Sequence, residues 1–165
     1  MPETGIQERH KVLAFYGVPS TGQAGYVWTR MKYFTSISTS KNPIEHNRKY
    51  VDEATQRNDV VGYDTSIAYA FDKYTGDQVL TDIVNIHNKE LTGEAAIRPI
   101  LIVDTFDGSA STRNYAVIPD AEGDDANIYT YSGNFKANGE LSFGTATTTD
   151  NWVHITFTAD EDQEG

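Results

Sequence analysis

Apolar and polar side chains alternate at every second residue in several segments of this chain, and this alternation constrains the fold more than any other feature. A period of two is that of a β-strand, because successive side chains of a strand point to opposite faces of a sheet. In residues 26–37 one face would carry Val27, Met31, Tyr33 and Ile37, and the other Trp28, Arg30, Lys32 and Phe34. We therefore expect a single strand with one apolar and one mixed face here.

The same analysis predicts further strands along the chain. Residues 97–104 are almost continuously apolar, as expected of a strand that is covered on both faces. Asn138-Gly139 favours a type I′ turn, which would fold residues 140–148 back onto residues 127–136. The other predicted strands are residues 65–72 with Ile67, Tyr69 and Phe71 inward, residues 113–119 with Tyr115 and Val117 on one side, and residues 152–158 with Val153, Ile155 and Phe157 on one face.

One helix is expected, near residues 77–91. Asp77 is a suitable N-cap, and Gly93 follows the last apolar residue, as glycine often does where a helix ends. The apolar stripe at helical spacing comprises Val79, Leu80, Ile83, Val84 and Ile86. The fold class is therefore mainly β, a β-sandwich or half-barrel with one flanking helix. We expect Leu80, Ile83, Val84, Leu101, Val103 and Ile155 to be buried.

Charge is distributed unevenly along the 165 residues. The net charge is −11, and residues 114–165 contribute ten acids and a single base, Lys136. An acidic surface repels phosphate, which argues against sequence-specific DNA or RNA binding.

The chain has no cysteine, so disulfides, thiolate metal sites and cysteine nucleophiles are excluded. With no apolar run long enough for a membrane span and no signal-peptide pattern, we expect a soluble protein made in a cytoplasm.

Residues 39–63 form a long, charged and only locally apolar segment between predicted strands. A connection of this length is often functional. Its cations and acids are nearly balanced, which suggests a segment that becomes ordered against another subunit. A solvated excursion or an extended hairpin is the alternative.

No catalytic motif is present, so we expect no enzymatic activity and no cofactor. The four histidines are scattered, and Asp104 and Asp107 are better explained by turn formation than as an acid/base pair. The acidic stretch 120–125 lacks the glycine position of an EF-hand loop. Weak cation binding there remains open, although an acidic loop is the simpler interpretation.

Several segments occur together in a fixed order and spacing. They are residues 30–43, 48–53, 59–63, 67–72, 113–120 and 129–135, followed by Asn138-Gly139. In this order and spacing they resemble the major tail tube proteins of tailed phages of Gram-positive bacteria, of the siphophage type, and the resemblance covers about residues 25–157.

The resemblance implies hexameric rings that stack into a hollow tube through which DNA passes at ejection, without specific binding. Similar subunits build contractile tails, phage-like bacteriocins and type VI secretion tubes. The implied partners are other copies of the chain, tape-measure proteins and tail-tip or terminator proteins, in a virion tail. The expected domains are an N-terminal arm (1–24), one β domain (25–158) with the excursion 39–63, and an acidic, disordered tail (159–165).

Two sets of residues are candidates for this role. The candidate assembly contacts are Arg48, Lys49, Tyr50, Asp52, Glu53 and Asp59, with the cations facing acids of a neighbouring copy. The candidate acidic residues of a tube lumen are Asp120, Glu122, Asp124, Asp125 and Glu140. The competing hypothesis is a binding module that holds a carbohydrate or a receptor at Trp28, Tyr63 or Trp152.

Overall fold

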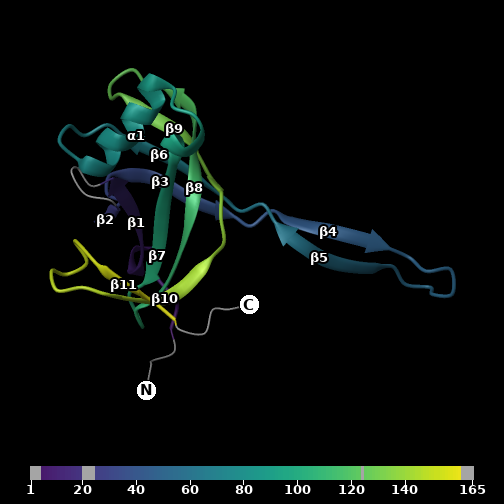
Figure 1. Ribbon diagram of the computed structural model, residues 1–165. Helices are drawn as coiled ribbons and strands as arrows, with labels where there is room; N and C mark the ends of the chain where they lie inside the picture. Colours follow the sequence, from purple (N-terminus) through teal and green to yellow (C-terminus); the bar gives the residue numbers. More distant parts are fainter. Residues whose placement is uncertain (1–4, 20–24, 124, 161–165) are drawn as a thin grey trace.

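A half-barrel of antiparallel strands with one helix forms the body of the protein, and a separate two-stranded arm projects from it (Figure 1). The structure is a computed structural model and describes residues 5–19, 25–123 and 125–160. Its elements are η1 (Arg9–Lys11), β1 (Val12–Pro19), β2 (Tyr26–Arg30), β3 (Phe34–Ser40), β4 (Pro43–Arg48), β5 (Arg57–Tyr63), β6 (Ser66–Asp72), α1 (Gln78–Lys89), η2 (Gly93–Ala96), β7 (Ile97–Asp104), β8 (Ser109–Glu122), β9 (Thr130–Ala137), β10 (Ser142–Thr147) and β11 (Thr156–Ala159).

The body is one nine-stranded sheet with the order β2-β1-β7-β8-β9-β6-β3. Strand β10 pairs with β8, and β11 pairs with β10, so these two strands leave the main path. The mainly β fold class with one helix is confirmed. Among the described residues, no helix has the length and apolar character needed to cross a membrane.

Two hydrophobic clusters lie on opposite faces of the central strands. The larger cluster packs α1 against the sheet and contains Ile100 of β7. The smaller cluster contains Leu101 and Val103 of the same strand, and Phe157 of β11 packs against it. Strand β7 is therefore covered on both faces, as its continuous apolar sequence predicts.

The predicted core is largely confirmed. Leu80, Ile83, Val84, Leu101 and Val103 are buried, as are Ile67, Tyr69, Phe71, Tyr115 and Val117. Ile155 is only partly buried, against the smaller cluster, and Val153 is exposed. The last strand is correspondingly shorter than predicted, since the chain turns through Asn151 and Trp152 with positive φ before β11 begins.

Residues 12–19 correct the predicted N-terminal arm, because they form β1 inside the sheet. Phe15 and Tyr16 of this strand are fully buried and face the two different clusters. The almost continuously apolar run from Val12 to Val18 is the signal that sequence analysis left unused.

The single strand predicted over residues 26–37 is divided into β2 and β3. Tyr33 adopts a left-handed φ of 67° at the break, and its ring stacks on Tyr74 at 4.0 Å. Of residues 31–33, which separate the two strands, Met31 is buried in the core and Tyr33 is 48% exposed. Val27 of β2, which was expected on the same apolar face, is 46% exposed. The left-handed conformation of Tyr33 therefore interrupts the continuous alternation on which the prediction relied.

The hairpin predicted at Asn138-Gly139 is wrong. Strand β9 already pairs with β8 on one edge and β6 on the other, so no edge is free for residues 140–148. Strand β10 instead crosses to β8 and β11, where Gly144 is required because a Cβ atom would lie 2.1 Å from the Thr158 carbonyl oxygen.

Helix α1 begins as predicted but ends earlier. The Asp77 carboxylate accepts a hydrogen bond from the Leu80 amide at 3.1 Å. The left-handed residue at the C-terminal end is Glu90, with φ 49°, and Gly93 instead begins η2.

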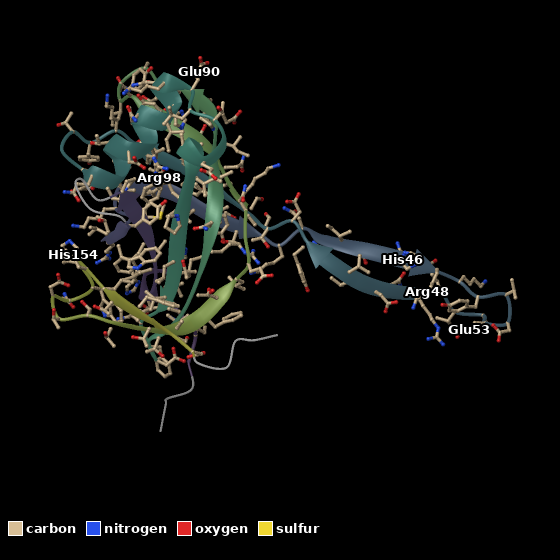
Figure 2. The ribbon with its side chains drawn as sticks, in the orientation of Figure 1. His46, Arg48, Glu53, Glu90, Arg98 and His154 are labelled. Carbon is tan, nitrogen blue, oxygen red and sulfur yellow. The ribbon has the colours of Figure 1, made fainter. Side chains whose placement is uncertain are left out.

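A buried ion pair attaches α1 to the sheet. Arg98 Nε donates to Asp82 Oδ2 at 2.8 Å, and the Tyr16 hydroxyl donates to the same oxygen at 2.5 Å. Arg98 Nη1 also donates to the Ala95 and Ile97 carbonyl oxygens, so the guanidinium is well satisfied. Figure 2 shows Arg98 beneath the helix.

We expect Asp82→Ala to lower the free energy of unfolding by about 3–5 kcal/mol, because it leaves the Arg98 charge buried without its partner. Lys89→Ala, on the exposed part of the same helix, should change it by only about 0.5 kcal/mol. Chemical denaturation of both variants measures the difference. Equal effects would show that the pair does not hold the helix.

A second prediction concerns His87, whose Nε2 lies 2.7 Å from the Tyr69 hydroxyl in the core. Burial lowers the pKa of His87 below its usual 6.5, and the negative charge of Glu122 opposes this only in part. The folded state therefore binds the proton more weakly than the unfolded chain does. Stability should be full above pH 6.5 and decline as the pH falls below it.

Denaturation of wild type and His87→Gln between pH 7.5 and 5 tests this coupling. The variant should lose part of the pH dependence, whatever its stability at pH 7.5. If the free energy of unfolding changes equally with pH in the two proteins, the assignment to His87 is contradicted.

Candidate assembly surface

The excursion predicted over residues 39–63 is an extended hairpin, the alternative that sequence analysis left open. Strands β4 and β5 form a sheet of their own, which projects from the body as an arm (Figure 1). We call residues 43–63 the arm. Two-stranded hairpins are marginally stable in water, because they have no core of their own. The stability of the arm therefore depends on contacts between its own side chains and on any partner that covers its surface.

The tip of the arm is joined by charged and aromatic contacts. Arg48 pairs with Asp59 at 2.5 Å, and its Nε donates to the Tyr50 hydroxyl at 2.8 Å. Arg57 pairs with Glu53 at 2.8 Å. The hydrogen bond that Arg48 donates to the Asp59 carboxylate is the main reason that the pKa of Arg48 lies above its usual value. Both guanidinium groups lie 5.7 Å from the centre of the Tyr50 ring.

These pairs bear on the role expected of the charged candidates. Arg48, Glu53 and Asp59 have partners within the arm of the single subunit, so their charges are paired even without a neighbouring copy. The side chains of Lys49 and Asp52 form no ion pair or hydrogen bond within the described part of the chain. Figure 2 shows Arg48 and Glu53 toward the end of the arm.

Sequence analysis did not single out the apolar side chains of the arm. Each of the following is more than half exposed: Ile44, Val51, Val60, Val61 and Tyr63. The register shifts beside Glu45 and leaves Val61 without a paired residue. Val60 and Val61 are both exposed, because the two-stranded sheet has no other layer covering it. The adjacent valines within a polar segment are the signal that could have identified them. Clustered exposed apolar residues are typical of interaction sites.

The acidic lumen candidates do not form one cluster. Asp120 and Glu122 lie in β8, Asp125 lies in the loop before β9, and Glu140 follows β9, so these residues lie near opposite ends of β9. All four are exposed. Asp124 lies outside the described residues, as does most of the acidic tail.

Two of these acidic side chains form hydrogen bonds within the subunit. Asp125 accepts hydrogen bonds from the Asn127 and Ile128 amides, which lower the pKa of its carboxyl group. Glu122 accepts a hydrogen bond from the Tyr129 hydroxyl at 3.0 Å. No group of three or more metal-ligating side chains is found within residues 5–19, 25–123 and 125–160.

Asp104 and Asp107 have the turn roles predicted for them. The Asp104 carboxylate accepts from the Phe106 amide at 2.9 Å, and Asp107 accepts from the Ser109 amide and hydroxyl. The two carboxylates are therefore engaged in local structure.

The aromatic residues of the binding-module hypothesis are not gathered at one groove. Trp28 and Trp152 pack against the smaller core cluster, whereas Tyr63 is exposed on the arm. The structure thus offers no shared aromatic surface from these three residues.

Comparison by sequence gives no match to any protein-family model or curated protein. Comparison by structure gives a chain from the tail of an empty gene transfer agent particle, solved with C6 symmetry, at a TM-score of 0.62 and 12% identity. The match covers 84% of this chain and 98% of that one. A chain of the anti-feeding prophage baseplate, sixfold symmetrised, matches with a TM-score of 0.51 and 10% identity, over 86% of this chain and 97% of that one. The protein therefore has a fold found in subunits of phage-like tail assemblies.

Proposed function

We propose that this protein is the structural subunit of a phage-like tail tube, in which six copies form a ring and the rings stack around a lumen that conducts DNA at ejection. The fold, shared with chains of sixfold-symmetric tail assemblies, supports this proposal. A siphophage tail of a Gram-positive host and a contractile injection system such as a phage-like bacteriocin remain alternatives within the same class. Either role is structural rather than enzymatic.

The observation that carries the proposal is the arm. It extends away from the body and exposes apolar side chains that the subunit itself does not cover. A tube subunit needs a contact that closes the ring and another, head-to-tail contact that propagates the filament. We assign the arm to a contact with a neighbouring copy, where Ile44, Val60, Val61 and Tyr63 become buried. Lys49 and Asp52 are the tip charges available to that neighbour.

The Arg48–Asp59 pair gives a specific prediction for assembly. Arg48→Glu places two acids beside each other in the arm and should prevent rings and tubes that the wild type forms at high concentration. The double variant Arg48→Glu/Asp59→Arg restores the pair within the arm with reversed polarity. If Arg48 acts only by stiffening the arm, the double variant should assemble again.

Negative-stain imaging and sedimentation of the three proteins provide the measurement, with Lys89→Glu as a control outside the arm. Failure of the double variant would instead indicate that Arg48 contacts an acid of the neighbouring copy. Normal assembly of the single variant would exclude the arm charges from a role in assembly. A wild type that stays monomeric, even at high concentration and with tail-tip proteins present, would contradict the tube proposal.

We also propose that acidic residues from the C-terminal third line the lumen and keep DNA from adhering. The support is the distribution of charge, since residues 114–165 carry ten acids and one base. A basic wall would attract the duplex at every ring, whereas like charge keeps it mobile.

Single substitutions by Lys at Asp120, Glu122, Asp125 and Glu140 test this lumen. Positions in the lumen should increase the retention of duplex DNA by assembled tubes, and the increase should disappear at high salt. Glu94→Lys, in η2, provides a comparison outside this acidic region. No increase at any of the four positions would contradict an acidic lumen.

Tape-measure, tail-tip and terminator proteins are the proposed partners, and the proposed location is the virion tail after synthesis in the host cytoplasm. DNA is a passing cargo rather than a bound ligand in this account.

A further inference from the structure

The half-barrel is open along one side, between β1 and β3. A groove of about 590 Å³ runs there and continues into a second hollow of about 340 Å³, and Arg9 and Ile37 line both. The first part is also lined by Ala14, Met31 and Phe34, which belong to the rim of the larger core cluster. The groove therefore has an apolar floor that is continuous with the core.

Cations gather at this groove, although the chain as a whole carries a charge of −11. Arg9, Arg30 and Lys32 line it, and no Asp or Glu is among its described lining residues. None of the three forms an ion pair within the part of the chain that the structure describes. His10 also lines the groove, but it lies 3.1 Å from the Glu8 carboxylate.

One wall of the groove, β3, is an open strand edge. Strand β3 pairs only with β6, and β2 pairs with residues 15–19 of β1, so residues 12–14 have no strand beside them on that edge. Arg9 bridges the two walls, because its guanidinium donates to the Val12 carbonyl oxygen at 2.8 Å and the Ile37 carbonyl oxygen at 3.4 Å. An extended peptide in the groove would find backbone hydrogen-bonding groups along β3. The wall formed by β1 offers few, because the Val12 amide donates to the Arg9 carbonyl oxygen and the Ala14 carbonyl oxygen accepts from the Met31 amide.

We propose that this groove binds the acidic run of residues 160–164 from a second copy of the chain. This run has four acids in five residues and complements the three cations. The inference rests on the proposed function, because the stacking of copies in a tube would bring the tail of one copy to the groove of another.

The position of β11 favours a second copy over the same chain. Strands β10 and β11 pack with the smaller core cluster, which lies on the face of β1 and β7 opposite the groove. Asp160 is still joined to β10, because its amide donates to the Phe143 carbonyl oxygen, and the four residues after it span at most about 14 Å when fully extended. Within one chain, the run would have to pass around the edge of the sheet within that length and then lie along the groove.

A labelled peptide with the sequence of residues 159–165 tests the proposal by fluorescence anisotropy on the dilute full-length protein. It should bind the wild type, and its affinity should fall about tenfold or more for the Arg9→Gln/Arg30→Gln/Lys32→Gln variant. The matched control Lys41→Gln/Lys89→Gln/Lys136→Gln removes the same charge elsewhere and should bind within about twofold of wild type. Circular dichroism checks that both variants are folded.

A peptide with the acids replaced by Asn and Gln should not bind, and high salt should weaken the acidic peptide because exposed charges are screened. Absence of binding to the wild type, or an equal loss in the groove and control variants, would overturn the proposal. A further test uses full-length protein in which the acids of its own residues 160–164 are replaced by Asn and Gln. If the peptide binds this variant but not the wild type, the groove is occupied by the tail of the same chain, and the proposal is overturned. Tube formation is not needed for this measurement, so failure of the tube proposal is detected separately, by imaging.

Discussion

Strand β7 lies between two hydrophobic clusters, and the rest of the body depends on covering both of its faces. Helix α1 covers one face, where the Asp82–Arg98 pair fixes the helix to the sheet. Strands β10 and β11 cover the other face, which is why the chain after β9 crosses the sheet instead of forming a local hairpin. A half-barrel results, with its remaining opening between β1 and β3.

The arm has no comparable source of stability. Its strands pair only with each other, and exposed ion pairs of the kind at its tip contribute little in water, typically about 0–1 kcal/mol each. The apolar side chains near its base remain uncovered in the single subunit. A segment of this kind gains most of its stability from a partner. The proposed tube supplies that partner as another copy of the same chain, and the cationic groove would supply a second contact of electrostatic character.

Local signals predicted much of the body. The cap at Asp77 and the stripe through Ile83 identified the helix, and the alternation through Tyr69 identified the inward face of β6. Prediction failed where tertiary contacts override local preference, as at Tyr33 and at the Asn138-Gly139 turn.

The candidate site was predicted only in part. The unusual segment was found by its length and charge, but the pairing of Arg48 with Asp59 depends on the cross-strand register. Sequence alone did not reveal that register, or the exposure of Val60 and Val61. Hydrogen exchange of the arm amides tests the central claim most directly. We expect β4 and β5 to exchange rapidly in dilute subunits and at least about tenfold more slowly in assembled particles. Assembled particles in which these amides exchange as fast as in the subunit would contradict the account.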